Sequence, residues 1–136
     1  MRILKIDRTV FDVGFDSDWN KLMNSYNAKG FEKMEFIGNL DLQNCIGFDG
    51  GNINLPIEME IKGHLMLDGA TIDSLPKKLI VNGVMSCTRT KIEFLPENLY
   101  VGGYLNVLRT KITKMPKKYY VKGTIYSDIY PSTGDF

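Results

Sequence analysis

The chain has 136 residues, of which 43% are hydrophobic and 24% are charged, and its formal net charge at pH 7 is +1. These values are ordinary for one soluble domain with its own core, and no apolar run approaches the ~20 residues of a membrane-spanning helix, which excludes that class of protein. Charge is unevenly divided, because residues 1–70 carry 11 acidic and 7 basic side chains and residues 71–136 carry 5 and 10. Such a split can steer a binding partner.

Residues 1–35 lie outside the repeat described below and are predicted to form an N-terminal cap of strand and short helix. The segment "MRILKIDRTVFDVGF" alternates apolar and polar residues, which predicts one or two strands. Because it carries Asp7 and Asp12 and has no uninterrupted apolar stretch, it lacks the pattern of a secretory signal. We therefore expect a cytoplasmic protein.

The segment "DSDWNKLMNSYNAKG" predicts a helix with Asp16 or Ser17 as its N-cap and Gly30 just past its end. Apolar side chains at helical spacing are expected to pack on the first row of the repeat, although a groove for a partner is an alternative. These side chains are Trp19, Leu22, Met23 and Tyr26.

From residue 36 onward the sequence repeats. Pro56, Pro76, Pro96 and Pro116 stand 20 residues apart, and each opens a row. Apolar side chains stand five, nine and eleven positions after the proline, and a glycine stands seven positions after it. The columns are Ile61, Val81, Val101 and Val121; Gly63, Gly83, Gly103 and Gly123; Leu65, Met85, Leu105 and Ile125; and Leu67, Cys87 and Val107.

This alternation predicts one strand with one buried face in each row. Because a short strand cannot bury that face alone, equivalent strands are expected to stack about 4.8 Å apart into a parallel sheet with a shared core. The predicted fold is mainly β, a parallel β-solenoid of about five turns over residues 36–125. Its first turn is "EFIGNLDLQNC", 25 rather than 20 residues before the next. The glycines are expected to let the incoming proline segment cross closely, and residues 126–136 to form a C-terminal cap or tail.

The rows resemble short leucine-rich repeats, whose segment is L-x-x-L-x-L-x-x-N/C-x-L. Leu105, Val107, Thr110 and Ile112 take the last four places of that motif, whereas its opening leucine is missing. Residues 76–123 are more closely similar to tandem repeats of the form LPxxLxVxGxLxLxxTxIxxLP in bacteriophage and prophage proteins. The resemblance implies a repeat architecture and a binding role without a defined activity.

We find no constellation for catalysis, metal binding or cofactor binding in the sequence. His64 is the only histidine and has neither an oriented second group nor further metal ligands. Cys45 and Cys87 fall in inward columns, where a reduced thiol is poorly reactive. No glycine-rich phosphate-binding motif is present. The prediction is a protein that is not an enzyme and uses no cofactor or metal.

Alternation places other side chains on the outer face of the predicted strands, and their apolar and aromatic content favours a protein-binding surface. The alternative is that outer positions vary freely because the repeat constrains only the inner columns. The candidate partner-binding residues are His64, Met66, Asp68, Val84, Ser86, Tyr104, Asn106, Leu108 and Tyr126.

A second candidate surface is a basic edge formed by Arg89, Lys91, Arg109 and Lys111 in "TRTK" and "LRTK". Such an edge could follow a phosphate backbone, and binding would then weaken steeply with salt. The alternative is that these charges are solvated and keep the edge from aggregating.

The sequence favours a non-catalytic protein-binding module. The resemblance implies a phage-encoded protein that binds and inhibits or redirects a host protein, such as a defence protein, in the bacterial cytoplasm. Two alternatives stay open: a nucleic-acid-binding accessory protein that uses the basic edge, and a structural component that self-assembles. A protein partner is expected before a nucleic acid, no membrane is expected, and the chain would be a monomer or small homo-oligomer.

Overall fold

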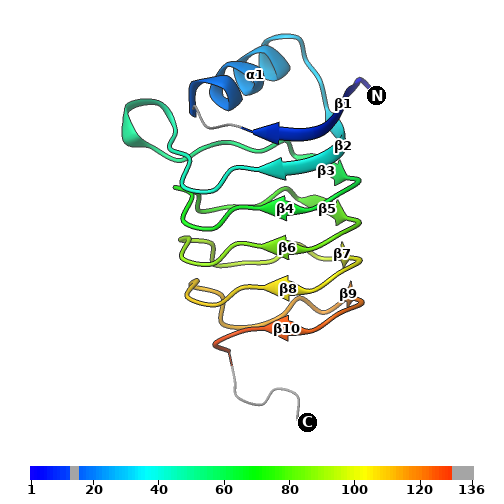
Figure 1. Cartoon of the computed structure of the whole chain (residues 1–136), viewed down its shortest axis with the longest axis vertical. Coiled ribbons are helices and arrows are strands. Elements are labelled where there is room, and N and C mark those ends of the chain that lie inside the picture. The colour runs from blue at the N-terminus through cyan, green and yellow to red at the C-terminus, as the bar shows by residue number, and fades with distance from the viewer. Residues whose placement is uncertain (13–15, 130–136) are drawn as a thin grey trace.

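A computed structural model of the chain describes residues 1–12 and 16–129, which form one long stack of short strands with a helix at one end (Figure 1). The first elements are β1 (Ile3–Asp12), α1 (Asp16–Ala28), β2 (Lys33–Asp41) and a 3₁₀ turn (Phe48–Gly50). The rows then supply β3 (Glu58–Ile61), β4 (Leu65–Met66), β5 (Lys78–Val81), β6 (Met85–Ser86), β7 (Leu99–Val101), β8 (Leu105–Asn106), β9 (Tyr119–Val121) and β10 (Ile125–Tyr126).

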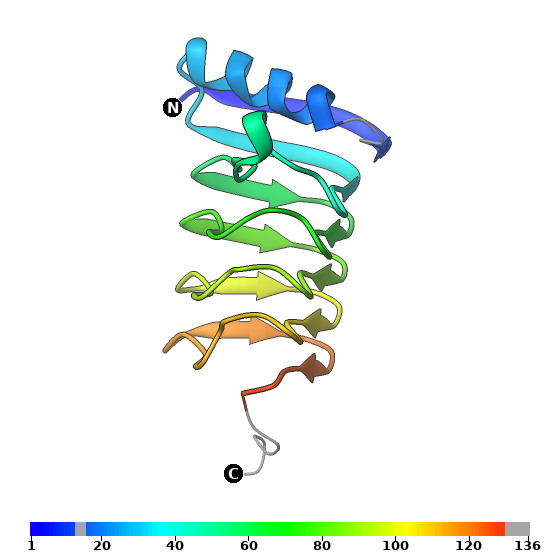
Figure 2. The same ribbon diagram turned by 90° about the vertical axis from the view of Figure 1, so that its left-hand side faces the viewer.

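All strand pairs are parallel, and the sheet divides at β2. The first half of β2 pairs with β3 and the second half pairs with β4. We call β3, β5, β7 and β9 the first ladder and β4, β6, β8 and β10 the second ladder. The strand order is β10-β8-β6-β4-β2-β3-β5-β7-β9, with β1 paired to β2 outside this path. Figures 1 and 2 show the two ladders on different sides of the stack.

The predicted β-solenoid of leucine-rich-repeat type with about five turns is wrong. The described residues form one ten-stranded, all-parallel sheet of the α/β type with few helical residues, and they contain neither a closed barrel nor a solenoid. The expected single strand per row is also wrong, because the chain leaves the first ladder at Val81, bends through Gly83 and begins the second ladder at Met85. Inward and outward side chains alternate in one long strand and equally in two short strands joined by a bend. The alternation in the sequence therefore could not reveal this bend.

The 20-residue register of the apolar columns is confirmed. Val81 pairs with Val101 in the first ladder, and Met85 pairs with Leu105 in the second. Val81, Met85, Val101 and Leu105 are fully buried. Each row therefore adds apolar side chains at equivalent positions to one continuous core, as the spacing predicts.

The glycine column packs against the preceding row of the sheet, not against the proline segment as predicted. The Gly83 N–H donates to the Gly63 carbonyl at 2.9 Å, and Gly103 and Gly123 repeat this bond one row further on. A Cβ on Gly63 would stand 2.3 Å from the Gly38 carbonyl oxygen. Side chains are excluded from this column because backbone stacks directly on backbone.

The predicted N-terminal helix is confirmed as α1, which lies along β1 at one end of the stack (Figure 2). Trp19, Met23 and Tyr26 are buried and Leu22 is half-buried, as expected for the face that covers the first strands. The Trp19 Nε1–H donates to the Asn54 carbonyl at 2.8 Å. The predicted N-cap side chains and the last seven residues of the predicted C-terminal segment, 130–136, lie outside what the structure describes.

Candidate functional site

Polar side chains near the bend hydrogen-bond the backbone of the following row. The Asn39 Oδ1 accepts from the His64 N–H at 2.9 Å, and the His64 Nδ1 accepts from the Val84 N–H at 2.8 Å. A neutral His64 that accepts at Nδ1 carries its proton on Nε2. This histidine, predicted for the partner-binding face, is exposed and also connects two rows.

Polar side chains in or next to the second ladder are also hydrogen-bonded, either to the following row or within their own row. The Asp68 Oδ1 accepts from the Ser86 hydroxyl at 2.6 Å and from the Thr88 N–H at 2.8 Å. The Asn106 Oδ1 accepts from the Leu108 N–H at 3.1 Å. Ser86 was predicted to be available to a partner, but only 3% of it is exposed, because Asp68 of the row before lies against it.

The aromatic members of the predicted face are brought together. Tyr104 and Tyr126 lie in successive rows with ring centroids 5.6 Å apart in an edge-to-face arrangement, and 39% and 45% of them are exposed. Met66, Val84 and Leu108 are half-buried. The predicted face therefore keeps its aromatic side chains accessible, while several of its polar side chains are engaged in hydrogen bonds between or within rows.

A second tyrosine pair lies on the outward side of the first ladder and was missed. Tyr100 and Tyr120 are in register, and their rings stack with centroids 5.1 Å apart. The predicted strand started five positions after the proline, whereas β5 starts two positions after Pro76. Ile80, Tyr100 and Tyr120, four positions into each row, were the signal that could have revealed this column.

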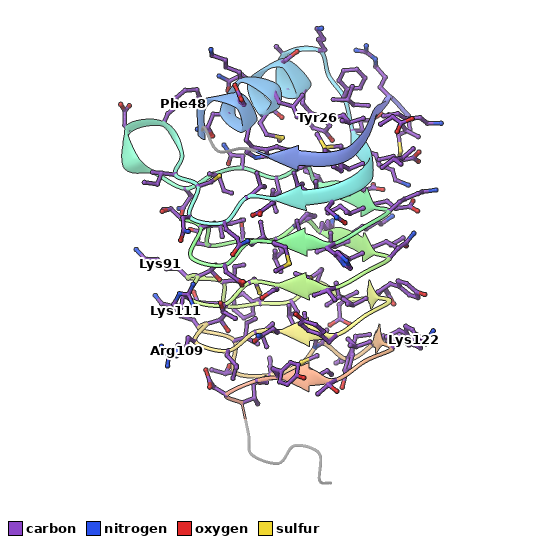
Figure 3. All side chains as sticks on the ribbon, in the orientation of Figure 1. Tyr26, Phe48, Lys91, Arg109, Lys111 and Lys122 are labelled. Carbon is purple, nitrogen blue, oxygen red and sulfur yellow. The ribbon has the colours of Figure 1, made fainter. Side chains whose placement is uncertain are left out.

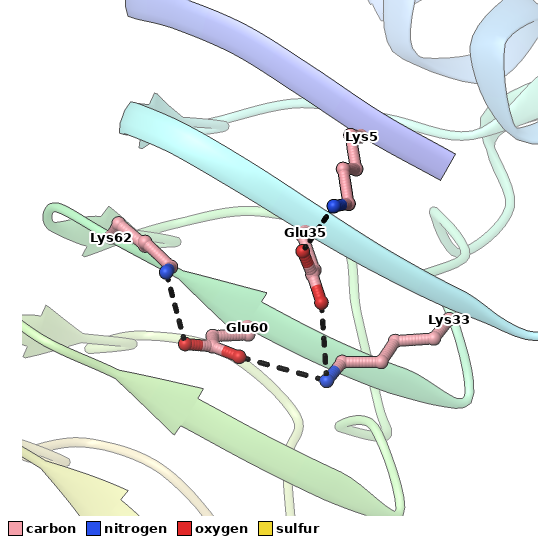
Figure 4. A network of polar contacts seen from close by, with 5 residues as sticks. All are labelled: Lys5, Lys33, Glu35, Glu60 and Lys62. Carbon is pink, nitrogen blue, oxygen red and sulfur yellow. Dashed lines mark ion pairs between the residues drawn. The ribbon is translucent and has the colours of Figure 1, made fainter. Parts of the chain in front are cut away.

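The same outward column is ionic at the other end of the sheet (Figure 4). Lys5, Glu35 and Glu60 are in register with one another. The Lys33 Nζ lies 3.5 Å from the Glu35 Oε2 and 3.6 Å from the Glu60 Oε1. Lys62 approaches Glu60 at 3.8 Å. Along one face, the column thus changes from paired charges near α1 to exposed tyrosines in the last rows.

The four residues of the predicted basic edge are all exposed. Lys91, Arg109 and Lys111 project from the same side of the stack in Figure 3. No ion pair found within residues 1–12 and 16–129 involves any of the four. Arg89 and Arg109 have φ values of 56° and 58°, in the left-handed region that disfavours residues with a Cβ.

The thiol of Cys87 is not activated. Burial, with a smaller contribution from Asp68, raises the pKa of Cys87 to about 12, so the thiol is neutral near pH 7. Among the described residues, no group of three or more His, Cys, Asp or Glu side chains is arranged to hold a metal ion.

Shallow grooves lie between the starts of successive rows. One of them is lined by Leu75, Pro76, Lys77, Phe94 and Pro96, and Phe94 is 69% exposed. The walls of this groove are mostly apolar, and the charged residues Asp73, Lys77, Lys78 and Glu97 also line it. Within the part of the chain that the structure describes, no helix has the length and apolar character needed to cross a membrane.

Comparisons with known proteins identify no relative: no protein-family model matches the chain, and neither a curated protein nor a solved structure is significantly similar to it.

Proposed function

We propose that this protein is a non-catalytic protein-binding module whose contact surface extends around the bend of the last two rows, from the Tyr100–Tyr120 pair on the first ladder to the Tyr104–Tyr126 pair on the second. We call Tyr100, Tyr104, Tyr120 and Tyr126 the tyrosine surface. The observation that supports this role is their exposure in two aromatic pairs on the last two rows, one stacked and one edge-to-face, with 39% to 50% of each residue accessible. Tyrosine supplies a large contact area at low entropic cost and is enriched among the residues that dominate interface energies.

The arrangement around the tyrosines supports binding by a preformed surface. Tyr100, Tyr120 and Tyr126 lie in paired strands, and the Tyr104 carbonyl accepts from the Met85 N–H at 3.0 Å. The neighbouring polar groups of Asp68, Ser86 and Asn106 are already hydrogen-bonded. A partner would therefore meet side chains whose positions are largely fixed before contact. Preorganisation of this kind lowers the ordering cost of association.

The wider part of the proposal depends on the resemblance of residues 76–123 to tandem repeats of bacteriophage and prophage proteins. On that basis the partner would be a bacterial host protein, such as a defence protein, that the module inhibits or redirects in the host cytoplasm. Activity by occlusion requires no reacting group on this chain. It requires only that the tyrosine surface cover a functional surface of the partner.

Affinity capture from bacterial lysate with the full chain as bait tests the proposed surface. The double variant Tyr104→Ala/Tyr126→Asp should lose the captured partner, because it removes one aromatic pair and introduces a charge. Phe48→Ala is the matched control, since Phe48 is 56% exposed on the loop near α1 and should leave capture unchanged. Equal recovery of one partner by wild type and the double variant would contradict the proposed surface, provided that circular dichroism shows the same folded state.

Nucleic-acid binding is a second candidate, supported by the four exposed cations of the basic edge, none of which takes part in an ion pair among the described residues. A cationic edge of this kind would bind phosphates, and the affinity would fall steeply as salt rises. Fluorescence anisotropy with mixed DNA and RNA at low ionic strength, compared between wild type and Arg89→Gln/Arg109→Gln, measures this. The absence of any salt-dependent binding would eliminate the candidate.

A further inference from the structure

In the second ladder, backbone N–H groups of each row donate to carbonyls of the next row, but the last row has no next row within residues 1–12 and 16–129. The Leu105 and Val107 N–H groups donate to the carbonyls of the next row, Thr124 at 3.0 Å and Tyr126 at 2.8 Å. The equivalent Met85 and Cys87 groups do the same one row earlier. In the last row, the Ile125 and Ser127 N–H groups have no such acceptor among the described residues.

At the end of the first ladder, backbone carbonyls are left without a next row in the same way. The Val101 and Gly103 carbonyls accept from the Lys122 and Gly123 N–H groups, both at 2.9 Å. One row later, the carbonyls of Val121 and Gly123 have no donor within the described part of the chain. We call these two donors and two acceptors, carried by β9, β10, the bend between them and Ser127 just after β10, the terminal edge.

The core is also incompletely covered at this end. Leu99 and Leu105 are essentially fully buried, whereas Tyr119 in the column of Leu99 is 42% exposed. Val121 and Ile125 are only partly buried. One further row with aliphatic side chains at the inner positions would bury these residues and would also complete the unused hydrogen bonds.

The charge around the last row indicates the charge that an added strand should carry. Residues 97–129 contain six basic and two acidic side chains. Both carboxylates are already engaged: Glu97 accepts from the Lys117 and Lys118 N–H groups, and Asp128 accepts from the Arg109 N–H. Lys117, Lys118 and Lys122 are exposed, and no ion pair found in the described residues involves them. The terminal edge is therefore apolar along its core side and cationic around it.

We infer that the terminal edge binds an extended, acidic segment of a partner protein, which adds to the sheet as the next parallel strand. Backbone hydrogen bonds would supply affinity for an extended chain, while aliphatic residues alternating with carboxylates would supply specificity. A second copy of this chain fits less well, since the N-terminal end of the stack is covered by β1 and α1 and two terminal edges would bring like charges together. The inference depends on the proposed protein-binding function and assigns the chemistry of the partner.

The probe is a synthetic peptide that copies residues 98–108 with glutamate at the positions of Tyr100, Tyr104 and Asn106. Its aliphatic residues at the positions of Leu99, Val101, Leu105 and Val107 then match the core columns, and three of its outward residues are acidic. We expect saturable binding to the full chain by calorimetry, and appearance of hydrogen-exchange protection at the amides of Ile125 and Ser127. A peptide with lysine at the same three positions should bind at least about tenfold more weakly, because the charge attraction becomes repulsion.

Two further controls separate the parts of the inference. A glutamate peptide with methylated backbone nitrogens keeps its charge but cannot donate hydrogen bonds, and it should lose binding. In the protein, Lys122→Glu should weaken binding of the glutamate peptide by about three- to tenfold, whereas Lys21→Glu, the same charge change on α1, should have no effect. Equal binding of the three peptides, or equal effects of the two variants, would overturn the inference.

Hydrogen exchange without peptide tests the other possible occupants. Fast exchange at Ile125 and Ser127 at every protein concentration is the expected result. Protection that does not change on dilution would mean that the chain covers its own edge, and protection that grows with concentration would mean that a second copy does; either overturns the inference. Loss of partner capture in the tyrosine variant together with absent peptide binding would contradict only the terminal-edge inference, and the reverse result would contradict only the tyrosine surface.

Discussion

At the scale of single residues, two features of the structure cannot be predicted from the local sequence pattern, because they depend on backbone conformation and on tertiary neighbours. Tyr26 is buried and its hydroxyl has no hydrogen-bond partner among the described residues, and Arg89 has a left-handed backbone at a position equivalent to Gly69 of the row before. The helical spacing correctly predicted that Tyr26 is buried. It could not predict whether a hydrogen-bond partner would lie near the hydroxyl, because that depends on the tertiary neighbours of α1.

Replacement of Tyr26 by phenylalanine should leave stability unchanged or raise it by up to about 1 kcal/mol, because a buried hydroxyl without a partner forfeits its hydration. Burial, followed by the charges of Glu58 and Glu32, raises the pKa of this hydroxyl, which agrees with a poorly solvated site. The ring contact with Phe31, at 5.9 Å between centroids, is kept. Urea unfolding measures the change, with exposed Tyr100→Phe as the control. A loss of 1 kcal/mol or more would show that the hydroxyl has a partner.

Replacement of Arg89 by glycine should stabilise the fold by about 0.5–1 kcal/mol. A residue with a Cβ pays roughly 1–2 kcal/mol in the left-handed region, and part of the gain is offset by the greater freedom of glycine in the unfolded chain. Lys91→Gly is the matched control, since it removes one charge from the same edge without relieving a positive φ, and it should destabilise. If thermal unfolding shows Arg89→Gly to be the more damaging change, the arginine side chain makes a stabilising contact that outweighs the backbone strain.

At the scale of elements, the sequence predicted which residues stack and in which register, but it did not predict where each strand ends. The proline spacing and the inner columns were sufficient for the register, because stacked rows must repeat the same buried side chains. The bend at Gly83 was missed because the inward alternation continues on both sides of it. The same error hid half of the tyrosine surface, since Tyr100 and Tyr120 belong to strands that start earlier than the pattern indicated.

The glycine column predicts a graded cost of substitution along the stack. Gly63→Ala should destabilise by about 1–3 kcal/mol, because the new Cβ would lie 2.3 Å from a carbonyl oxygen and 2.6 Å from the Asn39 side chain. Gly123→Ala should cost less, since its nearest contacts are 3.0 Å and it lies in the last row. Chemical denaturation of the two variants measures the difference. Equal costs would mean that the backbone of the first rows can shift to accept a methyl group.

Among the charged side chains near α1, Lys33 should contribute more to the stability of the fold than Lys62. Lys33 lies between the carboxylates of Glu35 and Glu60, which face each other in register on adjacent strands. Lys33→Met should therefore cost about 1 kcal/mol, because it leaves two like charges opposed, whereas Lys62→Met should cost roughly half of that or less. Unfolding at low and high salt measures both variants. A cost for Lys33→Met that does not shrink at high salt would indicate lost packing instead of lost charge compensation.

At the scale of the whole molecule, the two ends of the stack are different. β1 and α1 cover the first rows, while β9 and β10 end the sheet with half-covered aliphatic residues and exposed lysines. The sequence indicated the N-terminal covering through the apolar spacing of α1 and showed the positive charge of the second half. It could not locate the terminal edge, because an unused hydrogen bond is defined by the absence of a neighbouring row and not by any residue type.

This asymmetry predicts a gradient of local stability along the stack. Interior rows have a neighbour on both sides, whereas the last row has one, so the free energy of local opening should fall toward β9 and β10. In native-state hydrogen exchange, the amides of Met85 and Cys87 should be the better protected, because the next row accepts from both, and those of Ile125 and Ser127 should exchange fastest in the second ladder. Gly123→Ala should accelerate exchange in the last row only, while Gly63→Ala should accelerate it on both sides of the substituted row, since that row is interior. Uniform protection from β4 to β10 would show that the rows open together as one cooperative unit, and the terminal edge would then be no more accessible to an added strand than the middle of the sheet.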